Sequence, residues 1–310
     1  ADAAADAARA RLADARRTVG TDVVRAYAAA ALAEANAVVA RRSAGLLGDE
    51  ARIAEVRWHA GDISRSERDQ IEVAATRLEL DAGAAAAAAR AQRIALEQLL
   101  GMPGPEGLSV VADSLEDLAA RADVEPGPPA GGPRADLAAA RADLRAADAE
   151  LRLQLAERVP DPTLFVQAEH APPDRPNSLG GGVSLPLPLW NRNGAGIAAA
   201  RAALEQADRA ARRAEAQIAA DVAAARARYD EARARWHRYR DDIRPRAAAI
   251  RESVSLAYEK GGASLLDLLE AERTDNDVRL AAMQAASDVT VAAAELRAAQ
   301  QPLTPEDSPP

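Results

Sequence analysis

The chain has 310 residues, of which 48% are hydrophobic but only 3% aromatic, and its 39 basic and 48 acidic residues give a formal net charge of -9. Alanine supplies most of the apolar content, and it favours helix strongly while offering little side chain to bury. This composition argues against one thick globular core and favours long, closely packed helices in an elongated body. Because both charge signs are interleaved, no basic face for nucleic acid stands out.

The first predicted element is a long helix. From Val19 onward, apolar residues recur in alternating steps of four and three, which predicts a coiled-coil seam that ends on Trp58. No apolar run is expected to reach the ~18 residues of a membrane-spanning helix. The opening ADAAADAARARL has no signal-peptide core, so the chain is expected to start in mid-helix and to be N-terminally truncated.

Two glycine turns predict an internal repeat. The stretch RWHAGDISRSERDQIEVAATRLEL begins at Arg57, and AYEKGGASLLDLLEAERTDNDVRL begins two hundred residues later at Ala257. This shift matches Gly61 with Gly261 and Ser64 with Ser264. A left-handed glycine can close one helix and the serine can cap the next, which predicts two long antiparallel αα-hairpins. The alternative is a pair of ordinary helical turns.

Proline and glycine divide the rest of the chain. A short helix is predicted at Ser114 to Ala122, and a second coiled-coil seam runs from Ile218 to Ile243 and resumes at Ile250. The predicted divisions are a first-repeat helical hairpin (1–101), a Pro/Gly-rich linker or equatorial region (102–133), a helix of the second repeat (134–159), a β-hairpin (160–190), a second long helical hairpin (191–300) and a disordered tail (301–310).

Two segments in the middle of the chain predict strands. They read TLFVQAEH and SLGGGVSLPLPLW, and the APPDRPN between them predicts a loop. In the first, Leu164, Val166 and Ala168 alternate with Phe165, Gln167 and Glu169. Two strands alone do not make a stable sheet in water, but each is near the ~9 to 11 residues of a tilted membrane-spanning strand. Pro186 and Pro188 remove ladder donors, which predicts a strand edge or end.

The order of these elements resembles a known family. A strand ending in LPLPLWNRNGAGI, a long coiled helix, YEKGGASLLDLLEAE and a return helix resemble the second half of TolC-like outer-membrane efflux factors, and are similar to their cation-efflux branch. Residues 1–101 resemble the helical hairpin of the first half. The resemblance implies a mainly α fold in which three protomers, with four strands each, share an outer-membrane β-barrel above a periplasmic tunnel. Only two strands are predicted here, so this chain alone is not expected to close that barrel.

The resemblance implies transport without catalysis. It implies a passive homotrimeric conduit for metal cations or small toxic compounds, working with a periplasmic adaptor, an RND-type inner-membrane pump and outer-membrane lipid. It implies no nucleic acid, cofactor, catalytic residue or metal site, and His59, His170 and His237 lie on three separate predicted elements. The alternative is a soluble structural coiled-coil scaffold without a pore, which explains the heptads but gives no reason for the strands or the repeat.

The resemblance also implies roles for three groups of residues. Glu67, Asp267 and Glu270 are expected to form a ring of carboxylates around a periplasmic aperture. The alternative is that these acidic residues only stabilise the start of a helix through its dipole. The hairpin tips are expected to contact the adaptor: Gly61, Asp62, Ile63, Ser64, Arg65, Gly261, Gly262, Ala263, Ser264 and Leu265. The strand-to-helix joint is expected at Pro186, Pro188, Trp190, Asn191, Asn193 and Gly194.

Overall fold

The computed structural model describes residues 2–102, 114–124, 127, 132–159, 161–171, 175–185 and 192–302. The chain forms two compact units. The first contains Ala1–Asp14, Gly131–Ala219 and Pro302–Pro310, and the second contains Ala15–Ala130 and Ala220–Gln301. The predicted tail from 303 onward and most of the predicted linker lie outside the described residues.

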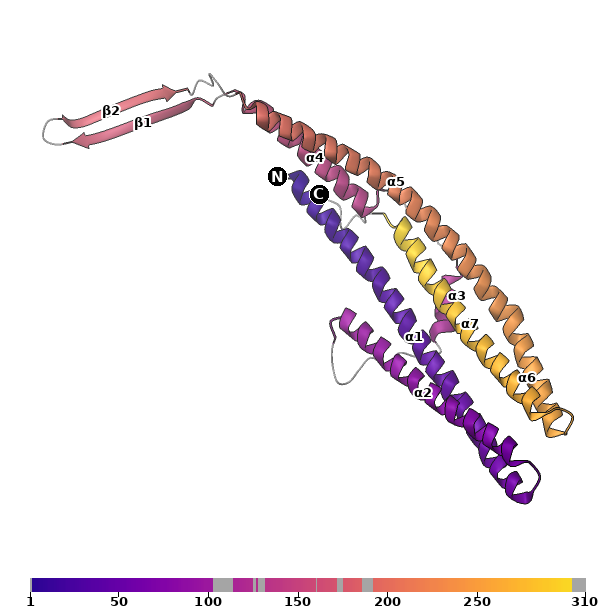
Figure 1. Ribbon diagram of the computed structural model, residues 1–310. Helices are drawn as coiled ribbons and strands as arrows, with labels where there is room; N and C mark the ends of the chain where they lie inside the picture. The colour runs from indigo at the N-terminus through magenta and orange to yellow at the C-terminus, as the bar shows by residue number, and fades with distance from the viewer. Residues whose placement is uncertain are drawn as a thin grey trace. The chain divides into compact units, whose positions relative to one another are not determined.

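The fold is mainly helical, with one small sheet, as the sequence predicts (Figure 1). The elements in chain order are α1 (Asp2–Ala60), α2 (Arg65–Leu99), α3 (Ser114–Ala122), α4 (Ala135–Ala156), β1 (Thr163–Ala171), β2 (Arg175–Ser184), α5 (Gly194–Arg238), the π-helical segment η1 (Tyr239–Ile243), α6 (Arg244–Glu259) and α7 (Leu265–Gln300).

Alanine forms much of the core of the second unit. The main cluster joins α1, α2, α3, α5 and α7, and its largest side chains are Tyr229, Trp236, Leu96, Leu115 and Leu296. Small alanines between these side chains let the helix backbones approach closely, which is why a chain with so few aromatic residues still buries a continuous interface.

One expectation about α1 is wrong. An 18-residue window of this helix reaches a mean hydropathy of 1.3 with no more than two charged residues, so by length and composition it is apolar enough to cross a membrane. Its apolar content is mostly alanine, and Ala28, Ala30 and Ala31 are almost fully buried. The last two pack in the main core cluster of the second unit, so packing between helices accounts for at least part of this apolar face.

Helix continues from α5 through η1 into α6, where the sequence predicts a long coiled helix whose seam runs to Ile243 and resumes at Ile250. In η1 the backbone N–H of Arg244 bonds to the carbonyl of Tyr239, five residues back, instead of the usual four. Pro245 follows at once, near the start of α6. Since proline has no N–H, the normal bond to the carbonyl of Asp241 cannot form, and this explains why the bulge lies here.

In the first unit, α4 packs beside the start of α1 and the first part of α5. Arg11 pairs with Asp143 at 2.5 Å, and Arg141 pairs with Glu215 at 3.4 Å. The two strands follow α4 and precede α5, so the sheet is attached to this pair of helices at one end (Figure 1).

The sheet is a single antiparallel hairpin. Thr163 lies opposite Ser184 at the end near the helices, and Val166 lies opposite Gly181. The strand bounds differ from the sequence prediction, because β2 begins at Arg175, inside the predicted loop, and ends at Ser184. Since β1 begins at Thr163, no residue of β1 remains to pair beyond Ser184. Pro186 and Pro188 lie outside the described residues.

Candidate functional site

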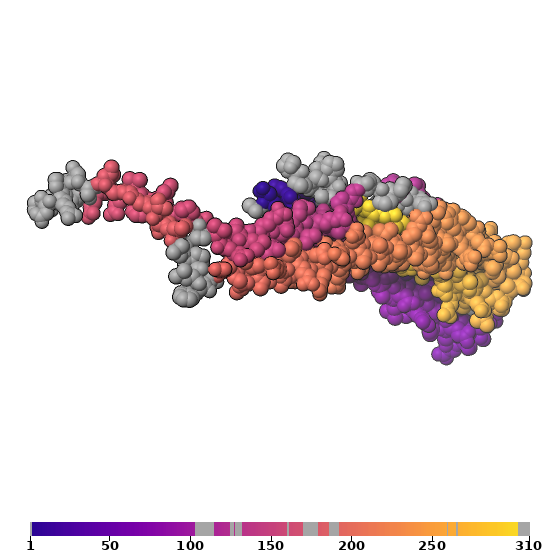
Figure 2. Space-filling view, turned by 90° about the horizontal axis from the view of Figure 1, so that it is seen from above, coloured from indigo at the N-terminus to yellow at the C-terminus, as the bar shows by residue number. Residues whose placement is uncertain are grey.

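The β-hairpin has two chemically different faces. On one, Leu164 and Val166 of β1 lie opposite Val183 and Gly181 of β2, and Ala168 lies opposite Leu179. The large side chains of this face are 66–82% exposed. The other face carries Phe165, Gln167 and Glu169, with glycines opposite the first two. Figure 2 shows that the hairpin extends beyond α4 and the first part of α5, where helices of this unit do not cover it.

Glycine makes room for an aromatic ring on the second face. A Cβ at Gly182 would lie 2.8 Å from Cζ of Phe165, which is closer than real side chains approach. The ring therefore lies across the neighbouring strand where that strand has no side chain. This packing fixes the only phenylalanine of the chain on the face that also carries Gln167 and Glu169.

The strand-to-helix joint is held by Asn193. This residue has a positive φ of 54°, which asparagine tolerates better than most residues. Its side-chain amide donates to the carbonyl of Gln154 at 3.1 Å, to Oε1 of Gln154 at 2.7 Å and to Oε2 of Glu157 at 3.1 Å. The end of α4 is thereby tied to the start of α5, which begins at the predicted Gly194.

Gly196 is the second constraint at this joint. A Cβ there would lie 2.4 Å from Oε1 of Gln154 and 2.3 Å from Oδ1 of Asn193. This glycine is not among the predicted joint residues, although it stands three residues after Asn193 in the motif LPLPLWNRNGAGI. The other predicted joint residues, Pro186, Pro188, Trp190 and Asn191, lie outside the described residues.

The two helical-hairpin tips have the same backbone construction. Gly61 and Gly261 have φ angles of 83° and 73°. Their N–H groups bond back to the carbonyls of Trp58 and Tyr258 at 3.0 and 2.9 Å, and the next N–H in each copy reaches the carbonyl five residues back. This is a Schellman termination, and its presence in both copies supports the predicted duplication.

A serine cap starts the second helix of each hairpin. The hydroxyls of Ser64 and Ser264 accept from the backbone N–H of Glu67 and Asp267, each at 3.2 Å. The two acidic side chains accept in return from the serine backbone N–H, each at 2.9 Å. These reciprocal bonds form a capping box, and removing such a serine typically costs about 1 kcal/mol.

Two of the predicted aperture residues, Glu67 and Asp267, belong to the capping boxes. Hydrogen bonds from the backbone and side chain of Ser64 lower the pKa of Glu67, and those from the side chain and backbone of Ser264 lower the pKa of Asp267. Both carboxylates are therefore ionised at neutral pH, and their stabilisation of the caps is lost as the pH falls through the lowered pKa values. Two of the three predicted aperture residues thus have a structural task.

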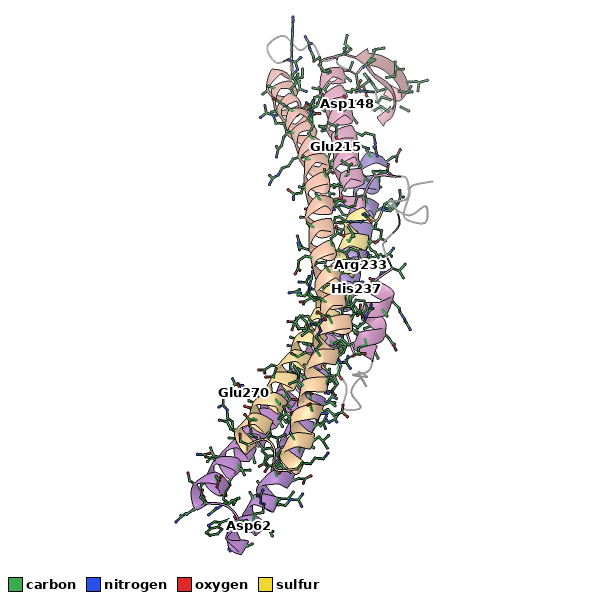
Figure 3. All side chains as sticks on the ribbon, turned by 90° about the vertical axis from the view of Figure 1, so that its right-hand side faces the viewer. Asp62, Asp148, Glu215, Arg233, His237 and Glu270 are labelled. Carbon is green, nitrogen blue, oxygen red and sulfur yellow. The ribbon has the colours of Figure 1, made fainter. Side chains whose placement is uncertain are left out.

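Glu270 differs from these two. It is exposed on α7, one turn after Asp267, and its carboxylate makes no hydrogen bond or ion pair within the described part of the chain. Figure 3 shows Glu270 on α7 and Asp62 at the tip of the α1–α2 hairpin. The local geometry leaves Glu270 as the acidic group of the set that is available for an outside ligand or ion.

Two polar contacts on the tip hairpins were not predicted from the sequence. Arg57 of α1 donates to the hydroxyl of Tyr258 of α6 at 3.5 Å. The carboxylate of Asp275 is nearly buried and pairs with Arg279 at 2.7 Å. The four-residue spacing from Asp275 to Arg279 is a readable signal for a helical ion pair, whereas nothing in the sequence relates Arg57 to Tyr258 beyond their places in the two copies.

Comparison with known proteins gives a consistent result. The chain is 24% identical over 277 residues to the cobalt-zinc-cadmium resistance protein CzcC of Cupriavidus metallidurans. The aligned region covers 86% of this chain and 64% of that relative. It therefore spans less than two thirds of the length of this relative.

Two solved structures show the same fold. The outer membrane protein VceC of Vibrio cholerae matches with a TM-score of 0.77 and 21% identity, over 96% of this chain and 73% of that one. The MtrE outer membrane channel of Neisseria gonorrhoeae matches with a TM-score of 0.75 and 20% identity, over 96% and 69%. The family described as outer membrane efflux protein matches residues 131–300, which is more than half of the chain. The chain belongs to the outer membrane efflux protein family.

Proposed function

We propose that this chain is the outer-membrane channel component of a tripartite efflux system, and that it acts as a passive conduit. The observation that carries the proposal is the β-hairpin, whose apolar face holds Leu164, Val166, Leu179 and Val183 and is exposed throughout. A β-barrel in a membrane needs an apolar face toward lipid and a more polar face toward the lumen. The hairpin of 9- and 10-residue strands supplies both.

A second surface supports assembly from several copies. The outer seam of α2 is the face turned away from α1, and all its residues are exposed. It consists of Val73, Thr76, Leu80, Ala84, Ala87, Ala91 and Ile94. The buried residues of α2, such as Ile71 and Leu96, lie on the opposite face, because a step of two residues turns a helix by about 200°.

The outer seam has the spacing of a coiled-coil contact. Its steps of three and four residues place it along one line, about 30 Å long at 1.5 Å per residue. It contains no charged residue. A helix that is apolar on two opposite faces needs a neighbour on each, and we assign the second neighbour to another copy of this chain in a homotrimer.

The exported substrate is proposed to be a divalent metal cation. This rests on the name of the relative from Cupriavidus metallidurans, a cobalt-zinc-cadmium resistance protein. A periplasmic adaptor at the hairpin tips (61–65 and 261–265) and an RND-type pump in the inner membrane would supply substrate and energy.

Metal export can be tested in cells. Deletion of the gene is expected to raise cell-associated cobalt, zinc or cadmium several-fold under metal stress, because the exit through the outer membrane is lost. A plasmid copy of the full-length gene should restore the wild-type level. If the deletion strain keeps normal metal content and tolerance, and becomes sensitive only to organic compounds, the metal assignment is wrong and the substrate is organic.

Glu270 is proposed to carry most of the charge effect at a periplasmic aperture. Three copies would bring three such carboxylates together, and a ring of carboxylates favours cations. Glu270→Gln is expected to reduce the cation preference of the full-length channel, measured as the reversal potential across a salt gradient in a planar bilayer. Adding Glu67→Gln and Asp267→Asn should change it less. An unchanged reversal potential in the triple variant would mean that these three residues do not line the aperture.

A further inference from the structure

The helix that leads from α5 into α6 has one weak point, η1. Its five residues replace the normal hydrogen-bond pattern by bonds one residue longer, and Pro245 removes a further backbone donor. Interruptions of this kind are common at kinks and at functional positions in helices. The segment is therefore a natural place for the helix to bend.

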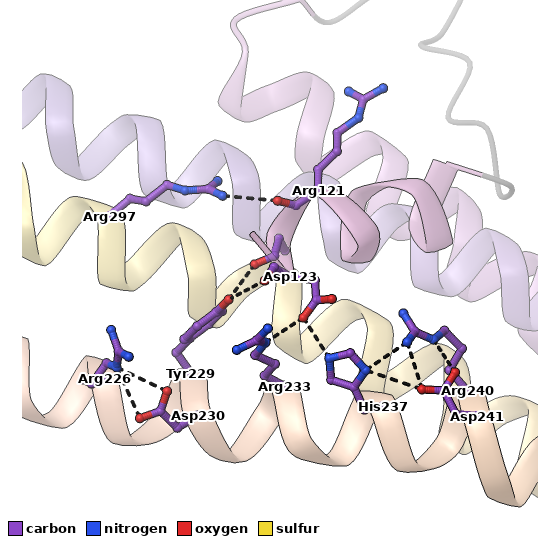
Figure 4. Close-up of polar contacts among 11 residues, drawn as sticks. Arg121, Asp123, Arg226, Tyr229, Asp230, Arg233, His237, Arg240, Asp241 and Arg297 are labelled. Atoms are coloured by element: carbon purple, nitrogen blue, oxygen red, sulfur yellow. Dashed lines mark hydrogen bonds and ion pairs between the residues drawn. The ribbon is translucent and has the colours of Figure 1, made fainter. Parts of the chain in front are cut away.

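The short helix α3 lies across this weak point. Glu116 at its start pairs with Arg244, the residue directly after η1, at 2.5 Å. Asp123, just beyond its end, accepts from Arg233 at 2.6 Å and contacts Nε2 of His237 at 2.8 Å, both before η1 (Figure 4). α3 thus contacts the long helix on both sides of the bulge.

The spacing of these contacts fits two antiparallel helices. Glu116 and Asp123 are seven residues apart, and so are His237 and Arg244. At 1.5 Å per residue both spans are about 10 Å. A nine-residue helix is therefore just long enough to connect the end of α5 with the start of α6.

Apolar and backbone contacts hold α3 in this position. Leu115, Ala119 and Ala122 are almost fully buried in the main core cluster. The buried hydroxyl of Tyr229 donates to the carbonyl of Ala122 at 2.9 Å, and Arg297 of α7 donates to the carbonyl of Arg121 at 3.5 Å. The last carbonyls of α3, which have no partner within a helix, are thus met by side chains of α5 and α7.

Charged groups on the long helix extend the contact into η1. Arg240 donates to both carboxylate oxygens of Asp241 at 2.7 and 2.8 Å, lies 2.9 Å from Nδ1 of His237 and stacks over Trp236 at 4.4 Å. Because an arginine N–H is always a donor, this contact places the imidazole proton on Nε2, where it can be donated to Asp123.

Both carboxylates of this network are ionised at neutral pH. Burial raises the pKa of Asp123, but hydrogen bonds and charges from Arg233 and His237 outweigh it and lower the pKa. The hydrogen bond from Arg240 lowers the pKa of Asp241. On α7, Asp288 pairs with Arg235 of α5 at 2.8 Å. The contacts of Asp123 with Arg233 and His237 therefore weaken as the pH falls through its lowered pKa.

We propose that η1 is a pivot for the α6–α7 tip hairpin and that α3 is a brace that holds this pivot in place. Detachment of α3 would let the tip hairpin swing. The link to channel opening rests on the proposed conduit function, but the mechanical relation between α3 and η1 does not.

Hydrogen exchange of the full-length protein in lipid nanodiscs tests the brace. The double variant Glu116→Gln and Asp123→Asn is expected to exchange the amides of 240–246 at least tenfold faster than the wild type. Asp288→Asn is the matched control, because it removes an ion pair between α5 and α7 without touching α3, and it should change this exchange less than twofold. In planar bilayers the double variant should also spend more time open.

A second variant covers the case in which α3 stays attached. Ala119→Glu places a charge at a fully buried position and should displace α3, seen as fast exchange across 115–122. If the amides of 240–246 still exchange slowly after α3 has detached, the proposal that α3 holds η1 in place is wrong. If the wild type forms no channel but η1 still loosens with α3, the conduit proposal fails and the brace stands.

Discussion

Val166→Arg is expected to prevent stable insertion of the full-length protein into the outer membrane. Val166 is 82% exposed, on the apolar face of β1 between Leu164 and Ala168. If that face meets lipid, an arginine near mid-depth costs about 2–4 kcal/mol per protomer, which corresponds to roughly a 30- to 700-fold loss in the folded, inserted population at 1.4 kcal/mol per factor of ten. The measurement is the amount of trimer in purified outer membranes.

The neighbouring residue provides the control for this change. Gln167 lies on the other face of the same strand, beside Phe165 and Glu169. Gln167→Arg adds the same charge one residue away, and it should leave the amount of trimer within about twofold of the wild type. Equal insertion of both arginine variants, or loss in the Gln167 variant alone, would contradict the assignment of the two faces.

Leu80→Glu is expected to prevent assembly of the trimer. Leu80 is 71% exposed near the middle of the outer seam of α2. Burying a leucine at each interface contributes about 1.5–3 kcal/mol, and the glutamate would in addition be buried without a partner, which costs several kcal/mol more. Native mass spectrometry of detergent-purified full-length protein should show monomers in place of trimers.

A change of the same charge on another face of α2 distinguishes an effect of the outer seam from an effect of net charge. Gln92→Glu also adds one negative charge to α2, at an exposed position outside the outer seam, and it should leave trimers intact. Trimers that survive Leu80→Glu unchanged would mean that this face of α2 does not contact another copy.

Local sequence signals predicted the tips and the family well. Gly61 and Gly261, followed by Ser64 and Ser264, were enough to predict both turns, because a positive φ and an N-cap each require few residue types. The efflux family and the outer-membrane location predicted from the order of the elements are confirmed by the match over 131–300. The short helix at Ser114 to Ala122 is also confirmed.

Features that depend on distant partners were not predicted. The predicted seam runs through Tyr239 to Ile243 and resumes at Ile250, which does not by itself predict a π-helical segment, and Pro245 alone does not distinguish a kink from a helix start. The contacts of Asp123 with Arg233 and His237 join residues more than a hundred positions apart. The end of β2 at Ser184 follows from where β1 begins, and not from any residue of β2 itself.

The aperture shows why a motif does not define a role. The spacing of Asp267 and Glu270 predicts that they share a helix face, but it does not show that Asp267 is engaged by its own cap through Ser264. Only the side-chain geometry separates the capping carboxylates from Glu270, and the role of Glu270 at an aperture stays a prediction.

Single-channel recording of the purified full-length protein in planar lipid bilayers tests the central claim most directly. A passive conduit predicts discrete current steps that need no energy source, scale with the salt concentration, and disappear in the Val166→Arg variant. Wild-type protein that inserts into the bilayer as a trimer and leaves its resistance unchanged would contradict the account.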